Sequence, residues 1–288
     1  MDRRRIAFNG RVAAAHLKGQ VDAERFVEGE RHAIGVGISD LRDAPKGSRD
    51  RQMVRGEPFV VLDLQDGWLF GYAERDGYVG WIDCSEINTT PTQKLTHKVS
   101  VARTYAKSSP GLKTMGRITP LSFDERFEVL DETDGWARVV WARGTIPHDF
   151  YVPMGHLVAV SHRESDPIAV AESLLGTPYL WGGNSSFGTD CSGLVQMACL
   201  ACGIPCPGDA DMQEEELGVT LPDDATLQRG DLLFWKGHVA WMADAQTLIH
   251  ANAFHMATAY EPLDAALTRI EAQGDGPVTS RKRLEQLA

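Results

Sequence analysis

The sequence TDCSGLV at residues 189–195 decides how the last third of the chain folds. Asp190 is a favoured N-cap residue, and the apolar residues that follow it recur at helical spacing. Gly203 is suited to end a helix, because glycine adopts the left-handed C-cap conformation without strain. The pattern predicts one helix with a buried face, running from Cys191 to about Cys202.

The segments around this helix are typical of an α+β domain. Asp166 and Pro167 favour the start of an earlier helix, which Gly176 ends. Short apolar runs after the Cys191 helix predict strands, and a further helix is expected after Pro262. The predicted strands are Leu232–Trp235, His238–Ala243, Thr247–Ala251 and Val278–Arg283. One buried helix ahead of a strand meander favours an α+β fold.

The N-terminal half contains an internal repeat. Residues 57–63 read EPFVVLD and precede DGW at 66–68, while residues 125–131 read ERFEVLD and precede DGW at 134–136. The copies match at a constant offset of 68 residues. A Phe-x-Val alternation before an Asp-Gly turn is the signature of a β-hairpin with one buried face. Each copy is therefore predicted to form a small β-barrel of short strands.

These patterns divide the chain into four parts. We expect an N-terminal arm at 1–27, a first barrel at 28–90, a second barrel at 91–160 and the α+β domain at 161–288. The threonine-rich segment Thr89–Thr92 is predicted to link the two barrels.

Charge and composition exclude several classes of protein. The net charge of −11 argues against binding to nucleic acid or to anionic lipid, since both need cationic surface. The basic residues near Met1 are not followed by an apolar stretch long enough for a secretion signal, and no apolar run approaches 18 residues. We therefore expect a cytoplasmic protein. Five cysteines, an odd number, do not suggest a disulfide framework.

Cys191 is a candidate nucleophile. At the first position of a helix, unpaired backbone N–H groups and the helix dipole favour a thiolate. The base must come from distant sequence, and His238 opens an apolar strand that can face the helix. His250 ends the next strand, 12 residues later, where it can orient the first histidine. Taken singly, a buried helix cysteine and a strand histidine are more often packing residues. Their order and contexts together favour a catalytic set.

The motifs that surround these residues resemble the NlpC-type cell-wall cysteine peptidases. The nucleophile region matches in GTPYLWGG at 176–183 and TDCSGLV at 189–195, the base strand in RGDLLFW at 229–235 with GHVA at 237–240, and the third strand in IHA at 249–251. Two bacterial SH3-like barrels ahead of this domain are similar to those of the dipeptidyl-peptidase VI-like subgroup. The resemblance implies a papain-like α+β catalytic domain preceded by two small SH3-like β-barrels.

The resemblance also implies an activity. The family's subgroup cleaves the γ-D-glutamyl–L-diamino-acid bond of murein peptides with a free N-terminal L-Ala, in cell-wall recycling. The resemblance assigns Cys191 as nucleophile, His238 as base and His250 as the residue that orients the base. It places Tyr179 at the oxyanion, where the phenol would help the Cys191 backbone N–H. No cofactor and no metal ligand set are implied.

Further residues match positions that hold the substrate amine in the family. They are Asp190, Ser192 and Asp209 in the catalytic domain and Glu57 and Tyr78 in the first barrel. One departure is that Ala210 follows Asp209, where the family often carries a serine. Glu57 also has a second interpretation, because the repeat carries Glu125 at the same place. A residue that recurs in both barrels can serve the barrel itself.

Other functions stay open at this point. Cys199 and Cys202 are spaced as in some zinc or redox sites, yet they fit a buried helix face better. A papain-like amidase or acyltransferase would use the same nucleophile and base with another acceptor. An exported peptidoglycan hydrolase, or a wall-binding protein in which the barrels do the work, are the further alternatives. The expected partner is a murein peptide, with no nucleic acid and no membrane.

Overall fold

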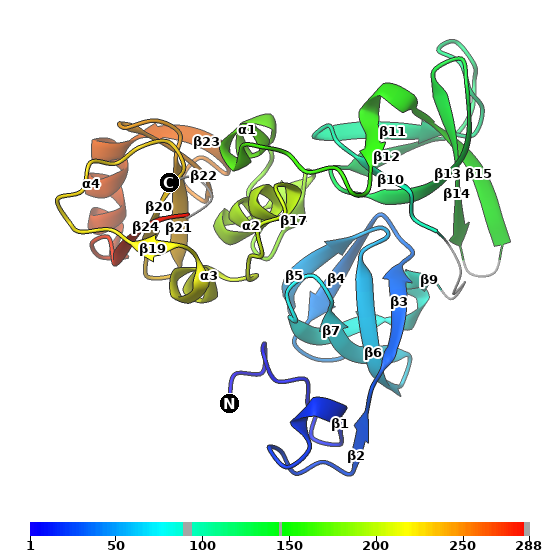
Figure 1. The fold of residues 1–288 in the computed structure, drawn as a ribbon, viewed down its shortest axis with the longest axis horizontal. Helices are drawn as coiled ribbons and strands as arrows, with labels where there is room; N and C mark the ends of the chain where they lie inside the picture. Colours follow the sequence, from blue (N-terminus) through cyan, green and yellow to red (C-terminus); the bar gives the residue numbers. More distant parts are fainter. Residues whose placement is uncertain (89–93, 144–145, 285–288) are drawn as a thin grey trace. The chain divides into compact units, whose positions relative to one another are not determined.

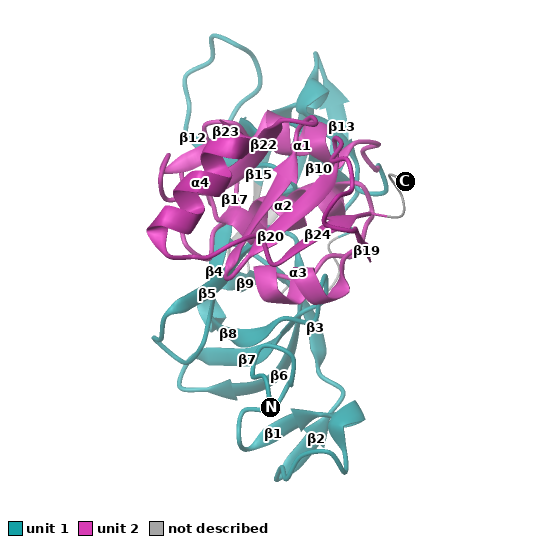
Figure 2. Ribbon diagram, turned by 90° about the vertical axis from the view of Figure 1, so that its left-hand side faces the viewer, with its two compact units in different colours: residues 1–162 teal, residues 163–288 magenta. Residues whose placement is uncertain are grey.

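The computed structural model describes residues 1–88, 94–143 and 146–284. The chain divides into two compact units, Met1–His162 and Arg163–Ala288, which are coloured separately in Figure 2. Unit 1 is built from strands and short 3-10 turns, while unit 2 combines α-helices with one main sheet (Figure 1). The predicted α+β class is confirmed. The predicted linker Thr89–Thr92 lies outside the described residues.

The internal repeat appears in the topology of unit 1. The first copy comprises β3 (Glu30–Ile34), β4 (Ile38–Arg42), β5 (Arg49–Val54), β6 (Pro58–Gln65), β7 (Trp68–Ala73), β8 (Val79–Asp83), η2 (Cys84–Glu86) and β9 (Ile87–Asn88). The second comprises β10 (His97–Val99), β11 (Arg103–Lys107), β12 (Ile118–Ser122), β13 (Arg126–Thr133), β14 (Trp136–Arg143), β15 (Ile146–Pro153), η3 (Met154–His156) and β16 (Leu157–Ala159). Their strand orders, β5-β4-β8-β7-β6-β3-β9 and β12-β11-β15-β14-β13-β10-β16, are the same.

The hairpin at the centre of each copy follows from its Asp-Gly turn. Asp66 and Gly67 have φ of 49° and 81°, and Asp134 and Gly135 have φ of 50° and 76°. Two successive left-handed residues make the turn whose twist matches that of the flanking strands. Each hairpin also shifts register by a bulge at the equivalent place, Val61/Asp63 and Val129/Asp131. The predicted hairpins are therefore confirmed, and each carries a bulge that the sequence did not predict.

The N-terminal segment packs on the first barrel. Its strand β1 (Val12–Ala14) pairs in parallel with β2 (Arg25–Val27), and η1 (Ala15–Leu17) joins them. Apolar residues of this segment share a core cluster with Val60, Leu62 and Trp81 of the barrel. The carboxylate of Asp63 accepts hydrogen bonds from Asn9 (2.9 Å), Arg11 (2.6 Å) and Arg25 (3.1 Å). Apolar burial and the hydrogen bonds to Asp63 together hold the segment on the barrel.

Unit 2 places its helices around a six-stranded sheet of order β19-β24-β20-β21-β22-β23 (Figure 1). The strands are β19 (Val219–Thr220), β20 (Asp231–Trp235), β21 (His238–Met242), β22 (Thr247–Asn252), β23 (Ala257–Pro262) and β24 (Ser280–Arg283), besides a two-stranded ribbon of β17 (Asn184–Ser185) and β18 (Gly188–Thr189). The helices are α1 (Pro167–Ser173), α2 (Cys191–Ala201), α3 (Ala210–Glu216) and α4 (Leu263–Gln273). The sequence did not predict β23 or α3.

Helix α2 is the centre of unit 2. It packs against α1, α3, β21 and β22, and ten of its eleven residues are buried. Helix α4 buries Ala266 and Ile270 against Leu233, Ala240 and Leu248 of the sheet. Because α2 is held from several sides, the backbone at its first residue is rigidly placed. No helix among the described residues is both long and apolar enough to cross a membrane.

Candidate active site

The candidate nucleophile is the first residue of α2. Asp190, its N-cap, accepts hydrogen bonds from the backbone N–H of Gly193 (2.6 Å) at one oxygen and of Gly182 (2.9 Å) at the other. Cys191 is 6% exposed. A Cβ on Gly193 would lie 2.3 Å from the Gly183 carbonyl oxygen, so glycine is required for this close approach. The cap and the glycines thus lock the thiol at a helix N-terminus, where a thiolate is favoured.

Tyr179 is held beside the nucleophile by its backbone. Its N–H donates to the Met256 carbonyl (3.0 Å), and it forms a parallel bridge with Thr189, two residues before Cys191. The pKa of the Tyr179 phenol is raised, first by burial and then by the negative charges of Cys191 and Asp190. The hydroxyl therefore stays protonated and can donate a hydrogen bond to a developing oxyanion.

The two predicted histidines are in direct contact. His238 begins β21 and His250 lies in β22, and Nε2 of the former is 2.9 Å from Nδ1 of the latter. Strands β21 and β22 are antiparallel, with Trp241 opposite Ile249 and Met242 opposite Leu248. His238 and His250 therefore lie on one face of the sheet and meet diagonally. The sequence expectation of neighbouring strand histidines agrees with this geometry.

Two residues that the sequence did not single out extend this contact. Nε2 of His250 lies 3.0 Å from Oε2 of Glu261 in β23. Glu261 in turn accepts two hydrogen bonds from Arg269 of α4, at 2.8 and 2.7 Å. Glu261 is 5% exposed and His250 1% exposed, so the contact between these two side chains is shielded from water. Strand β23 reads ATAYEP, without a clear apolar alternation, so no local pattern pointed to Glu261.

Burial and the arginine set the charges of this network. Burial lowers the pKa of His238 to about 3, assisted by the positive charges of His250 and Arg269. Burial also lowers the pKa of His250, although Glu261 opposes this shift. Burial alone would raise the pKa of Glu261, but hydrogen bonds from Arg269 and His250 bring it to about 2. At neutral pH the free protein therefore presents neutral imidazoles and an ionised carboxylate, and a neutral imidazole can accept a proton.

A cavity of about 520 Å³ adjoins His238 and Tyr179. Its aromatic wall includes Trp181 and Phe254, whose exposed fractions of 70% and 60% are high for such residues. The cavity is also lined by Lys236, Gly237, Asn252, Ala253, Arg269, Ile270, Gln273 and Asp275. The predicted base and the predicted oxyanion residue thus line one space, and exposed aromatic surface there suits a bound peptide.

The predicted amine-binding residues of unit 2 lie at the starts of α2 and α3, two helices in contact. Ser192 donates from Oγ to Asp190 (3.2 Å), and its carbonyl accepts from the buried amide of Gln213 (2.9 Å). The same Gln213 amide donates to Pro207 (2.9 Å) and to Cys206 (3.5 Å). Asp209 is the N-cap of α3, and Ala210 is its first residue and is buried.

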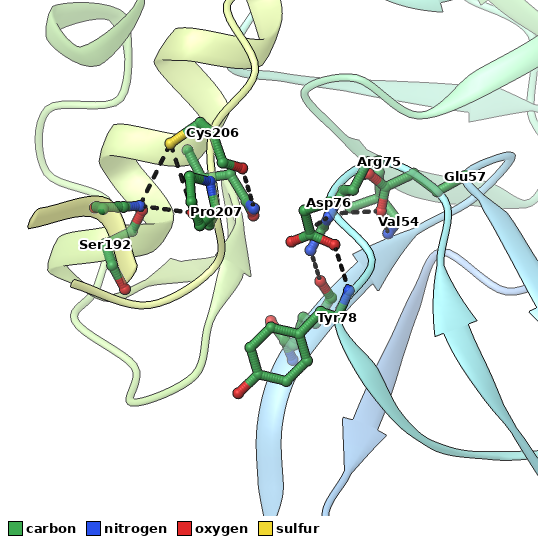
Figure 3. Close-up of polar contacts among 11 residues, drawn as sticks. Val54, Glu57, Arg75, Asp76, Tyr78, Ser192, Cys206 and Pro207 are labelled. Atoms are coloured by element: carbon green, nitrogen blue, oxygen red, sulfur yellow. Dashed lines mark hydrogen bonds and ion pairs between the residues drawn. The ribbon is translucent and has the colours of Figure 1, made fainter. Parts of the chain in front are cut away.

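The predicted residues of the first barrel belong to unit 1. Glu57 is 3% exposed and accepts hydrogen bonds from Arg75 at both oxygens (2.7 and 2.8 Å) and from the Val54 N–H (2.8 Å), seen in Figure 3. Tyr78 is buried, and its N–H donates to Asp76 (3.1 Å). Both residues are thus part of the barrel's own structure. Their contact with a substrate stays a prediction.

One group of side chains has the composition of a metal site. His250, His255 and Glu261 offer ligand atoms within 4.8 Å of one another. Both ring nitrogens of His250 are engaged, however, and Glu261 is paired with Arg269. A cation bound there would have to break these contacts and lie beside the guanidinium. These side chains are therefore better suited to hydrogen bonds with one another and with Arg269 than to binding a metal ion.

Comparison with known proteins identifies the class of protein. Residues 176–267 match the model of the NlpC/P60 family, and residues 41–87 match that of the bacterial dipeptidyl-peptidase SH3 domain. The chain is therefore a peptidase that carries an NlpC/P60 domain behind a bacterial dipeptidyl-peptidase SH3 domain. The matched residues include Cys191, His238, His250 and Glu261 in the catalytic unit and Glu57 in the barrel.

Individual relatives agree with this class. The chain is 28% identical to dipeptidyl-peptidase 6 of Lysinibacillus sphaericus, over 70% of this chain and 79% of that protein. It is 29% identical to the γ-D-glutamyl-L-lysine dipeptidyl-peptidase of Bacillus subtilis, over 64% of this chain and 62% of that protein. A crystal structure of an NlpC/P60 family protein from Bacillus cereus superposes with a TM-score of 0.73 at 20% identity, covering 90% of this chain and 100% of that one. The last match confirms the fold.

Proposed function

We propose that this chain is a cysteine endopeptidase that cleaves the γ-D-glutamyl–L-diamino-acid bond of murein peptides with a free N-terminal L-Ala. The observation that carries the proposal is the contact between His238 and His250, beside a cavity that Tyr179 also lines. Burial and the charge of Cys191 both raise the pKa of the Tyr179 phenol. The names of the relatives, which include a γ-D-glutamyl-L-lysine dipeptidyl-peptidase, support the choice of bond.

The proposed reaction begins with the thiol. His238 uses Nε2 toward His250, so its Nδ1 is the nitrogen available for the Cys191 proton. The thiolate then attacks the γ-carbonyl carbon of D-Glu, and the protonated His238 gives its proton to the leaving amine of the diamino acid. The product at this stage is a thioester between Cys191 and L-Ala-γ-D-Glu. Water activated by His238 hydrolyses the thioester and restores the thiol.

The oxyanion formed in each step needs donors that are in place beforehand. The backbone N–H of Cys191, at the start of α2, is proposed as one donor. The Tyr179 phenol is the second, since its raised pKa keeps its proton in place. Donors that are fixed before the reaction stabilise the charge without reorganisation. Loss of one such donor typically costs about 10²–10³ in kcat.

The carboxylates of Asp190 and Asp209 are proposed to select peptides with a free N-terminal amine. Asp190 is 7% exposed, and three of its hydrogen bonds come from neutral donors, namely Gly182, Ser192 and Gly193. A buried carboxylate favours an ammonium nearby. Asp209, from the neighbouring helix, adds negative charge, while Ala210 offers no hydroxyl. An N-acylated peptide would bring no positive charge to these groups.

Glu57 and Tyr78 are proposed to close the amine subsite from the first barrel. A carboxylate accepts about four hydrogen bonds, and Glu57 receives three, two from Arg75 and one from Val54. It therefore retains the capacity to accept a further donor. We also propose that the protein acts on short peptides in the cytoplasm during wall recycling, because a free L-Ala amine arises only after the glycan has been removed.

The test uses free L-Ala-γ-D-Glu-diaminopimelate and its N-acylated form as substrates, with products identified by mass spectrometry and Cys191→Ala as the control. Release of L-Ala-γ-D-Glu from the free peptide alone is the expected result. Cleavage of both peptides would retain the peptidase and remove the amine subsite. Activity on intact peptidoglycan would favour the exported hydrolase, and transfer of the acyl group to an added amine would favour the acyltransferase.

A further inference from the structure

The hydrogen bonds behind the proposed base run in one direction. An ionised carboxylate only accepts hydrogen bonds, so the Glu261 oxygen at 3.0 Å requires a proton on Nε2 of His250. A neutral imidazole carries one proton, and Nδ1 of His250 is then an acceptor. The contact of 2.9 Å to His238 therefore requires a proton on Nε2 of His238. This leaves Nδ1 of His238 with a lone pair.

Arg269 fixes the protonation state of Glu261, the first group in this series of hydrogen bonds. Its guanidinium donates to both oxygens of Glu261, at 2.8 and 2.7 Å, and to the side-chain oxygen of Gln273 at 2.7 Å. The guanidinium also lies 4.7 Å from the centre of the Phe254 ring. Arginine keeps its proton at all physiological pH values and has no acceptor. Glu261 therefore has to remain an acceptor, and so it also remains ionised.

We infer that Glu261 and Arg269 are positioning residues that fix the ring tautomers of His250 and His238 and thereby aim the lone pair of the base at the nucleophile. The inference rests on the proposed role of His238. Neither residue needs to touch the substrate for this. The relevant tautomer is the one that accepts the thiol proton, since an imidazole with a proton on Nδ1 cannot act as the base at that atom.

A purely structural role is the competing explanation. Glu261 and Arg269 join β23 to α4, so their loss could simply loosen the unit. A similar but more exposed pair exists for comparison. Glu172 of α1 accepts two hydrogen bonds from Arg229, at 2.8 and 2.9 Å, and one from Tyr260 (3.0 Å). It also joins two elements of unit 2, but its partners among the described residues include no histidine.

The experiment measures the tautomers directly in the full-length protein. Nitrogen-15 labelling of the nine histidines distinguishes protonated from unprotonated ring nitrogens, and His250→Gln and His238→Gln spectra assign the signals. The expected wild-type result at pH 7.5 is a proton on Nε2 of both His238 and His250. In Glu261→Gln, whose amide can either donate or accept, a mixture of tautomers is expected. Glu172→Gln should leave the spectrum unchanged.

Kinetics provide the second measurement. Glu261→Gln is expected to lower kcat on the order of 10- to 100-fold with little change in KM, less than the loss of about 10⁴ that a wrong tautomer causes next to a base. Glu172→Gln should retain kcat. The rate at which iodoacetamide alkylates Cys191 can be measured without a murein peptide. In Glu261→Gln, the pH dependence of this rate should move toward that of an ordinary thiol. This assay separates failure of the inference from failure of the proposed substrate.

A wild-type proton on Nδ1 of His238 would overturn the inference, even if the Glu261 variant does not fold. An unchanged tautomer pattern in Glu261→Gln, with kcat within twofold of wild type, would overturn it as well. If the wild type leaves the peptide intact but the alkylation profile shifts as expected in Glu261→Gln, the positioning role holds and the assigned substrate is wrong.

Discussion

Two buried glutamate–arginine pairs, one in each unit, have similar surroundings and different consequences. Glu57 and Arg75 of the first barrel have side chains 4% and 8% exposed, and Glu261 and Arg269 of the catalytic unit 6% and 16%. The remaining partner differs. Glu57 accepts from the backbone N–H of Val54, three residues earlier, whereas Glu261 accepts from His250. The first pair closes a turn, and the second controls a titratable ring.

The second barrel supports this distinction. Glu125, the repeat of Glu57, accepts from the backbone N–H of Ser122 (2.8 Å), again three residues earlier, and from Arg55 (3.1 Å). The turn contact is thus common to both copies, while the arginine comes from a different place in each. Burial and an arginine partner therefore do not identify a site residue. The third contact of the carboxylate is the informative one.

The largest effect is expected at the nucleophile. Cys191→Ala and His238→Ala should each lower kcat by more than about 10³-fold, because the chemistry has no other nucleophile or base. Cys199→Ala, which changes a buried cysteine of the same helix, should retain kcat within a few fold. Peptide cleavage assays measure both. Residual activity of Cys191→Ala near that of the wild type would remove the thiol from the mechanism.

The two arginines should then separate stability from catalysis. Arg75→Met leaves Glu57 buried without a counter-charge and should lower the free energy of unfolding by about 3 kcal/mol, with kcat within twofold of wild type. Arg269→Met should lower kcat at least tenfold. Urea unfolding and steady-state kinetics on both variants give the comparison. A loss of kcat in Arg75→Met as large as in Arg269→Met would erase the distinction between the pairs.

The pH dependence of stability should have opposite signs in the two units. His238 has a folded pKa of about 3, below the usual histidine value of about 6.5, so the unfolded chain takes up this proton first and stability falls as the pH drops through that window. Burial raises the folded pKa of Glu125 to about 7, so its contribution falls as the pH rises from about 4.5 to 7. Urea unfolding across this range should show a flatter high-pH decline in Glu125→Gln and a flatter low-pH decline in His238→Asn. Unchanged slopes in both variants would contradict these assignments.

The smallest effect is expected at Glu57. Glu57→Gln keeps a hydrogen-bond acceptor but removes the charge, and it should raise KM for the free-amine peptide about fivefold, the equivalent of about 1 kcal/mol. Glu125→Gln is the matched change in the other barrel and should leave KM unaltered. Equal KM values in the two variants would mean that Glu57 serves only its barrel, the second interpretation that the repeat itself suggests.

Much of the fold could be predicted from local patterns. The Asp-Gly turns required left-handed residues, and the hairpins formed where the repeat placed them. Asp190 and Gly203 marked the ends of the helix that begins at Cys191, and Gly203 has a φ of 77°. The contact between His238 and His250 followed from two short strands joined by a tight turn. In each case the information lies within a few residues of sequence.

The remainder depends on contacts between distant segments. Glu261 meets Arg269 only because α4 folds back over the edge of β23, and neither residue stands out in a local window. Strand β23 was missed because Ala257–Pro262 lacks a clear apolar alternation. Helix α3 has only seven residues and a strongly acidic end. The pairing of Arg55 with Glu125 likewise requires two residues 70 positions apart, one from each repeat, to meet.

The role of Cys191 as nucleophile is tested most directly by trapping the acyl-enzyme. Full-length protein mixed with L-Ala-γ-D-Glu-diaminopimelate and quenched in acid within the first turnovers would be analysed by intact mass and peptide mapping. We expect an adduct of L-Ala-γ-D-Glu that is joined to Cys191 as a thioester, that is more abundant in Glu261→Gln if deacylation is slowed, and that is absent in Cys191→Ala. Cleavage of the peptide without an adduct on Cys191, continuing in the Cys191→Ala protein, would contradict this role.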